Sequence, residues 1–98
     1  MTILAVLRRG DSHGYAITQA MQEAGFGRVT GGGLYPVLGR LEEAGLVMAR
    51  WAEGDGGPGR KIYALTEAGH RALSDQTQAW GGFREAVDAL LDERTPLA

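Results

Sequence analysis

Residues 30–66 constrain the fold more than any other segment, because a helical pattern is followed there without a break by strand patterns. Leu34, Leu38 and Leu41 recur at the spacing of one face of a helix. Gly45 then supplies the left-handed backbone position at which helices commonly end. The sequence therefore predicts a helix that ends at Gly45 and leads directly into residues with strand character.

Two strand patterns make up the rest of this segment. Residues 46–53 and 60–65 are enriched in Val, Ile, Trp and Tyr, and a glycine-rich loop at residues 54–59 separates them. Antiparallel strands with a flexible loop between them form a hairpin. A helix that feeds directly into such a hairpin is the arrangement of a winged helix-turn-helix, so the loop is expected to form the wing.

Two shorter helices are predicted before this segment. Residues 1–9 carry apolar side chains at the spacing of a helix packed along one side. Ser12 is the expected N-cap of a second helix over residues 13–24, because a serine oxygen can accept a hydrogen bond from a free helix amide. Gly25 and Gly27 are expected to close this second helix.

Pro36 leaves the start of the third helix open. Thr30 can cap this helix. If the helix starts at Gly31, the proline falls in its second turn and removes one backbone hydrogen bond. If the helix starts nearer Gly33, the proline lies in the first turn, where it is harmless. We expect a distorted first turn.

The last helix is predicted to begin after Thr66 and to carry a dimerisation seam. Its apolar residues fall on a heptad pattern. The seam residues are Leu73, Trp80, Phe83, Val87 and Leu90. The predicted fold class is therefore mainly α with a small β-hairpin: a winged helix-turn-helix over residues 1–65 and a long C-terminal dimerisation helix over residues 66–98.

The chain is short and slightly acidic, with 98 residues and a net charge of −2. At this length a partner chain is often needed to complete the buried core. Residues 1–65 carry seven basic and six acidic side chains, whereas residues 66–98 carry three basic and six acidic ones. The acidity therefore lies in the tail. A basic face can coexist with it, because salt screens charges beyond roughly 8 Å from a phosphate.

Several classes of function are excluded or disfavoured by composition and motif. The absence of cysteine rules out disulfides and zinc-thiolate sites, and neither histidine has a metal-ligand partner at helical spacing. No nucleotide-binding motif or catalytic triad is recognisable, so we expect no enzyme activity, no cofactor and no metal. No apolar run approaches the length of a membrane span, and no signal peptide is visible, so the expected location is the cytoplasm.

Several short segments of the sequence match a known family. The matching segments are His13-Gly14-Tyr15, Leu34-Tyr35-Pro36, Leu38, Arg40-Leu41-Glu42, Gly45-Leu46-Val47, Gly59-Arg60-Lys61, Tyr63 and Leu65-Thr66-Glu67-Ala68-Gly69. In this order and spacing, the chain resembles the PadR family of bacterial transcriptional regulators, specifically its short members with one C-terminal helix. The resemblance implies a winged-helix dimer, usually a repressor. It also implies a third helix in the major groove, a wing near the minor groove or backbone, and paired C-terminal helices.

The third helix departs from the family pattern. Positions 31 and 33, often Pro and Thr or Ser in the family, are both glycine here, and Gly39 stands where a basic or polar residue is common. The face opposite the leucine stripe is therefore nearly bare, with Arg40 as the main candidate to read bases. Two interpretations stay open: small residues let the helix backbone lie close to DNA, or the glycines only reflect a glycine-rich composition.

The candidate DNA contacts come from three places in the sequence. They are His13, Thr30, Gly31, Gly33, Tyr35, Arg40, Arg60 and Lys61. Exposed amides at the start of a helix can bind a backbone phosphate, a tyrosine hydroxyl can donate to one, and basic residues on a wing can reach one. The alternatives are a simple capped turn, core aromatic rings with solvated hydroxyls, and ordinary solvated charges. For Tyr15 we expect a place in the core.

Trp80 and Phe83 allow two interpretations. Packing between two C-terminal helices is the simpler one, and a site for a small aromatic effector, known for some PadR-like proteins, is the other. The predicted function is a DNA-binding transcriptional regulator, a repressor that binds an inverted-repeat operator in double-stranded DNA as a homodimer. The alternatives are a dimeric winged-helix protein-interaction module without DNA binding and an effector sensor whose DNA affinity is secondary.

Overall fold

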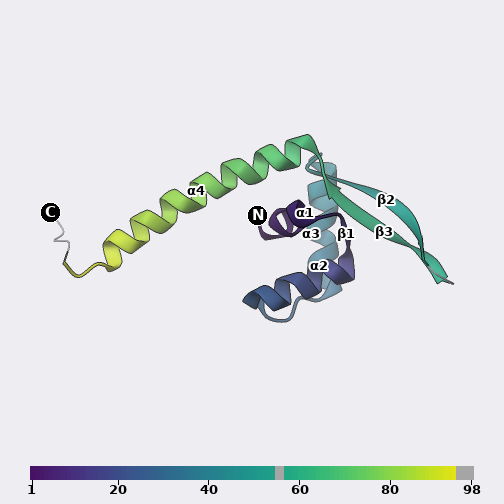
Figure 1. The fold of residues 1–98 in the computed structure, drawn as a ribbon, viewed down its shortest axis with the longest axis horizontal. Helices are drawn as coiled ribbons and strands as arrows, with labels where there is room; N and C mark the ends of the chain where they lie inside the picture. The colour runs from purple at the N-terminus through teal and green to yellow at the C-terminus, as the bar shows by residue number, and fades with distance from the viewer. Residues whose placement is uncertain (55–56, 95–98) are drawn as a thin grey trace.

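A computed structural model describes residues 1–54 and 57–94 of the chain. The elements follow one another in the order α1 (Thr2–Arg9), β1 (Ser12–His13), α2 (Gly14–Met21), η1 (Gln22–Phe26), α3 (Gly31–Glu43), β2 (Val47–Gly54), β3 (Gly57–Leu65) and α4 (Glu67–Leu91). The first three helices gather beside the sheet, while the hairpin and α4 extend from this centre in opposite directions (Figure 1). The predicted fold class, a mainly α winged helix with a long C-terminal helix, is confirmed.

The core lies between the three short helices, the base of the hairpin and the start of α4. Its buried residues are Ile3, Leu4, Leu7, Ile17, Leu34, Leu38, Val47, Tyr63 and Leu73. They come from both ends of the chain, so the first turns of α4 belong to the same packed unit as α1. We call residues 2–73 the winged unit.

The second helix begins differently from the prediction. Ser12 is not its N-cap, because Ser12 and His13 form the short strand β1, in which Ser12 pairs with Tyr63 of β3. His13 caps α2 instead, and its Nδ1 accepts a hydrogen bond from the amide of Ala16 at 3.3 Å. The α-helix also stops at Met21, and a π-helical segment continues to Phe26.

The cap and the end of the third helix agree with the prediction. Thr30 is its N-cap, with Oγ1 accepting from the amide of Gly33 at 3.3 Å. The helix starts at Gly31, which places Pro36 in the second turn. Gly45 has a φ of 75° just after the helix, and the amide of Leu46 donates back to the Leu41 carbonyl at 3.0 Å. This pattern is a Schellman motif, which turns the chain sharply into β2.

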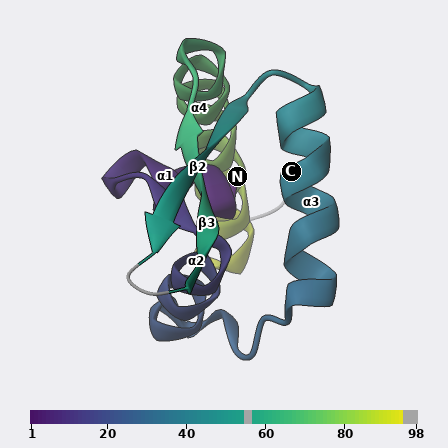
Figure 2. The same cartoon turned by 90° about the vertical axis from the view of Figure 1, so that its right-hand side faces the viewer.

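The sheet is antiparallel with the strand order β1-β3-β2. Figure 2 shows β2 beside β3. The two predicted hairpin strands are confirmed, and the register pairs Val47 with Leu65 and Trp51 with Lys61. The strand β1 is an addition that the sequence pattern did not predict. Part of the predicted wing loop, residues 55–56, lies outside the described residues.

The last helix runs for 25 residues, from Glu67 to Leu91. Thr66 caps it as predicted, because its Oγ1 accepts from the amide of Gly69 at 3.0 Å. The same hydroxyl donates to the carbonyl of Gly45 at 2.6 Å and so ties α4 to the end of α3. Within the described residues, no helix is long and apolar enough to cross a membrane.

Candidate nucleic-acid interface

One cleft brings together residues from the start of α2, the first half of α3 and the hairpin. It has a volume of about 590 Å³. Its lining residues are His13, Gly14, Tyr15, Tyr35, Trp51, Gly59, Arg60, Lys61 and Tyr63. We call this the hairpin cleft. Four of the predicted DNA contacts, namely His13, Tyr35, Arg60 and Lys61, share this one site although they are up to 48 residues apart in the sequence.

Tyr35 occupies a place that two glycines make available. A Cβ atom at Gly14 would collide with the hydroxyl of Tyr35, and one at Gly31 would lie 3.3 Å from its Cε2. The ring therefore lies across the first turn of α3 and the start of α2, while 53% of the residue stays exposed. The packing of Tyr35 therefore explains why glycine stands at both positions. Neither a glycine-rich composition nor close approach of DNA is needed to explain them.

The start of α3 is a capped turn, which was the alternative to a phosphate site in the sequence analysis. The Thr30 side chain serves the amide of Gly33, and the Thr30 carbonyl accepts from the amides of Gly33 and Leu34. The first amides of a helix have no acceptor within the helix. Gly31 and Gly33 are exposed, so this helix end faces solvent rather than the core.

The outer face of α3 is as bare as expected. Gly32, Pro36, Gly39 and Arg40 are all exposed, while Leu34 and Leu38 are buried on the opposite side. A Cβ atom at Gly39 would have no neighbour within 4 Å. Within the described part of the chain, the guanidinium of Arg40 forms no ion pair. Arg40 is therefore the single long, charged side chain in this group.

Two neighbouring side chains hold the ammonium group of Lys61 at the protein surface. Its Nζ lies 3.4 Å from Oε1 of Glu42 on α3 and 5.5 Å from the centre of the Tyr63 ring. The ion pair is partly exposed, so its contribution to stability is small. Because Glu42 already neutralises this ammonium, Lys61 is weaker than its neighbour Arg60 for attracting an anion.

His13 and Arg60 lie side by side at the rim of the hairpin cleft. His13 pairs with Ile62 across the sheet, and Arg60 lies two residues before Ile62 and hence on the same face. The Nη1 atom of Arg60 is 3.2 Å from Nε2 of His13. Two members of the predicted contact set that are 47 residues apart in the sequence are therefore direct neighbours.

Tyr15 does not lie in the core, so this expectation was wrong. The residue is 66% exposed, and its ring stacks almost parallel on the His13 ring, with 6.5 Å between centroids. Its hydroxyl oxygen accepts from Nε2 of Gln19 at 2.8 Å. As the second residue of α2, Tyr15 projects from the exposed side of the helix, whereas Ile17 fills the core.

Trp51 is a residue of the cleft that sequence reasoning did not single out. It is 74% exposed on β2, on the same strand face as the buried Val47. The hairpin extends beyond the helices that cover its base, so the later inward position becomes a surface position (Figure 1). A signal was present in the sequence, because a tryptophan so close to the predicted wing loop has little core available to it.

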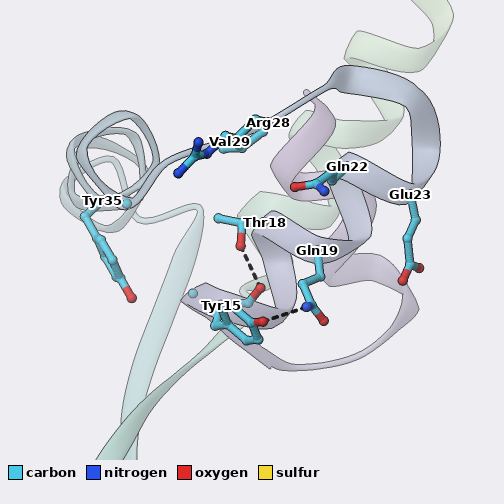
Figure 3. Close-up of a pocket in the computed structure, with 10 residues that line it drawn as sticks. Tyr15, Thr18, Gln19, Gln22, Glu23, Arg28, Val29 and Tyr35 are labelled. Carbon is cyan, nitrogen blue, oxygen red and sulfur yellow. Dashed lines mark hydrogen bonds between the residues drawn. The ribbon is translucent and has the colours of Figure 1, made fainter.

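A second cleft, of about 470 Å³, separates α2 from the start of α3. Tyr15, Thr18 and Gln19 line it from α2, Tyr35 lies across from them, and Arg28 reaches in from the connecting segment (Figure 3). The cleft is open and mostly polar in its lining side chains. It continues the surface of the hairpin cleft, because Gly14, Tyr15 and Tyr35 line both.

The predicted dimerisation residues divide into two groups. Leu73 is only 3% exposed because it packs in the core of its own chain. Trp80, Phe83 and Leu90 are exposed, and the rings of Trp80 and Phe83 lie 5.8 Å apart, tilted by 33°. Val87 is half-buried. Beyond Leu73, the helix thus presents large apolar side chains to solvent, on the seam that the heptad pattern predicted.

Comparison with known proteins agrees with this architecture. Residues 3–75 match the family model described as the transcriptional regulator PadR-like family. The transcriptional regulator YqjI of Escherichia coli is 35% identical over 91 residues, which are 91% of this chain and 42% of that protein. The chain therefore spans less than half the length of this relative.

Two solved structures extend the likeness to three dimensions. The PadR-like transcriptional regulator BC4206 of Bacillus cereus is 30% identical with a TM-score of 0.83, covering 92% of this chain and 87% of that one. Bacillus subtilis PadR in complex with operator DNA is 31% identical with a TM-score of 0.71, covering 78% of this chain and 43% of that one. Proteins of this family regulate transcription and are not enzymes. The chain belongs to the PadR-like family of transcriptional regulators.

Proposed function

We propose that this regulator binds an inverted-repeat operator as a homodimer and represses transcription by occluding a promoter. The observation that carries the proposal is the meeting of His13, Tyr35 and Arg60 around the hairpin cleft, beside the exposed face of α3. Phosphate contacts from several elements position a protein on a duplex, and one helix then reads base edges. The solved PadR–operator complex of Bacillus subtilis supports DNA as the partner.

Because the outer face of α3 carries few polar side chains, different residues are expected to make different kinds of DNA contact. Arg40 is the one side chain of its outer face that can make a bidentate contact with guanine. The Gly31 amide and the Thr30 hydroxyl hydrogen can bind a backbone phosphate, whereas the Gly33 amide is already held by Thr30. Most of the affinity then comes from the DNA backbone, and we expect sequence preference to rest on few bases together with DNA shape.

The second half of α4 supports the homodimer. Trp80, Phe83 and Leu90 form an exposed apolar stripe, and apolar stripes of this kind are usually buried against a partner. Two-fold symmetry places two copies of α3 in successive major grooves, about 34 Å apart. An inverted repeat follows from that symmetry. A planar aromatic effector between Trp80 and Phe83 would have to favour another spacing of the two α3 helices in order to release the operator.

The test is a selection from genomic duplex fragments, followed by fluorescence-anisotropy titration of the enriched sequence at low and moderate salt. We expect one palindromic sequence to be enriched and its affinity to fall steeply as salt rises. Arg40→Ala should weaken binding and relax the preference at one position of each half-site, by about 1–3 kcal/mol. Arg71→Ala removes the same charge from the exposed start of α4 and serves as the matched control.

The outcomes separate the candidate functions. Salt-dependent binding without an enriched palindrome would leave a DNA-binding protein but contradict the operator. Absence of any duplex binding would favour the dimeric protein-interaction module, which the net charge of −2 and the bare face of α3 support. In a Trp51→Phe background, emission from Trp80 reports on aromatic ligands, so ligand-induced quenching would support the effector site.

A further inference from the structure

Two contacts of the His13 ring cannot both be hydrogen bonds at the same time. Nδ1 lies 3.3 Å from the amide nitrogen of Ala16, which can only donate. Nε2 lies 3.2 Å from Nη1 of Arg60, which also can only donate. A neutral imidazole has one acceptor nitrogen and one N–H, so it can accept from one of these two neighbours.

The helix cap decides between them. Ala16 is the third residue of α2, and its amide has no acceptor within the helix. The guanidinium of Arg60 is exposed and can turn toward solvent. Losing the cap leaves a part-buried amide unpaired, whereas losing the Arg60 contact leaves a solvated cation. The cap therefore makes Nδ1 of His13 the acceptor and leaves Nε2 to carry the ring proton.

With this tautomer, the imidazole N–H and the guanidinium face one another as two donors. Neighbouring donors of this kind are satisfied together by one acceptor that carries negative charge. Two acids of this region are already paired, Glu42 with Lys61 and Asp11 with Arg50. The stacked ring of Tyr15 holds the imidazole, and the Tyr15 hydroxyl keeps its own hydrogen free because its oxygen accepts from Gln19. The rim of the hairpin cleft thus offers donors for an anion and no free carboxylate among its lining residues.

We propose that His13 and Arg60 together bind one phosphate of the DNA backbone, and that the cap of α2 fixes the donor tautomer of His13 for this contact. The inference deepens the proposed function and rests on it. It makes the start of α2 a second anchor on the duplex, beside α3. It also gives His13 two tasks, because the same ring starts the helix and binds the phosphate.

The first experiment compares His13→Asn with Arg60→Ala on the selected duplex. Asparagine is among the best N-cap residues, so it keeps the cap on Ala16, but its side chain is too short to replace Nε2. We expect His13→Asn to retain thermal stability and to lose about tenfold in affinity. Arg60→Ala should lose a similar factor. Because both donors serve one phosphate, the double variant should lose clearly less than the product of the two single losses.

The dependence of affinity on salt separates this role from a charged or merely structural one. Arg60→Ala should lower the slope of log affinity against log salt by about one, because one phosphate contact by a cation is lost. His13→Asn should leave the slope unchanged, because a neutral imidazole releases no counterion. Single methylphosphonate substitutions along the duplex should then identify one phosphate at which wild type loses more affinity than His13→Asn and at which the double variant loses nothing further.

Each other outcome overturns the proposal. Binding by His13→Asn with wild-type affinity would remove His13 from the interface, while wild-type binding itself would leave the proposed function standing. An equal fall of the salt slope in both variants would mean a charged His13 without a cap. Long-range ¹H–¹⁵N NMR that places the His13 proton on Nδ1 would also contradict the proposal. The exposed His70 provides the internal reference. If wild type binds no duplex, both proposals fail together.

Discussion

The winged unit and the second half of α4 satisfy their apolar side chains in different ways. In the winged unit, Leu4, Ile17 and Leu38 are completely buried among residues from four helices and the sheet. Beyond Leu73, the helix exposes Trp80 and Phe83 to solvent and projects away from the sheet (Figure 1). The winged unit therefore has its core within one chain, whereas the second half of α4 leaves large apolar side chains exposed.

This difference indicates where the stability of α4 and the function of the protein depend on the same surface. A helix in water owes most of its stability to the packing of its apolar face. Among the described residues, large apolar side chains of the second half of α4 remain exposed, and under the proposed function a partner helix covers them. If that partner is a second copy, the spacing of two DNA-binding surfaces depends on a surface that contributes nothing to the fold of either winged unit.

The largest expected effect comes from removing the exposed aromatic pair. Trp80→Ala combined with Phe83→Ala should convert the proposed dimer to monomers and reduce operator affinity by about 100-fold or more, because the second half-site no longer binds intramolecularly. Sedimentation and anisotropy measure the two effects. Gln78→Ala changes the opposite face of α4 and should leave both unchanged. A dimer that survives the double substitution would break the proposed division between the two regions.

The second prediction concerns the joint between the start of α4 and the turn after α3, within the winged unit. A Cβ atom at Gly69 would collide with the carbonyl of Leu46, so Gly69→Ala should lower the free energy of unfolding by about 1–3 kcal/mol in urea titrations. Gly82→Ala, in the same helix but in open space, should instead raise it by about 0.5–1 kcal/mol. Equal effects of the two substitutions would show that α4 does not pack on Leu46.

Thr66→Ala tests the same joint by a hydrogen bond. The Thr66 hydroxyl caps α4 through Gly69 and donates to the carbonyl of Gly45. Its loss should cost about 1 kcal/mol of stability. Thr66→Ser keeps both bonds and should recover most of this cost in the same thermal unfolding measurement. If serine fails to restore stability, the methyl group rather than the hydroxyl holds the joint.

The smallest expected effect lies on the bare face of α3. Gly39→Ala fills open space in an exposed helix and should stabilise the winged unit by about 0.5–1 kcal/mol. If the helix backbone lies close to DNA, the same methyl group should weaken operator binding severalfold. Unchanged or tighter binding would mean that this glycine reflects composition. Chemical unfolding and anisotropy on the same preparation decide between the two interpretations.

Much of the fold could be predicted because local signals agreed with the tertiary structure. The cap at Thr30 and the left-handed glycine at Gly45 both lie where the pattern placed them. The strand β1 was missed because two residues have no alternation to recognise. The prediction of Ser12 as the N-cap of α2 was wrong because Ser12 pairs with β3 in the sheet. Nδ1 of His13 accepts the capping hydrogen bond instead.

The sequence predicted which residues belong to the candidate site, but not which of them lie next to one another. Sequence spacing cannot place His13 beside Arg60, because the contact arises from the pairing of β1 with β3. The heptad pattern put Leu73 in the seam with Trp80, although contacts with the winged unit bury it in the core. Periodicity shows which face of a helix is apolar, while tertiary packing decides what covers each part of that face.

The most direct test of this account is sedimentation equilibrium of the wild-type protein, alone and with one palindromic duplex. The chain has a mass of 10.4 kDa, and the account predicts a free species of twice that mass. It also predicts that two chains bind each duplex. A free protein of single-chain mass that binds the duplex one to one would contradict the claim that the second half of α4 is completed by a second copy.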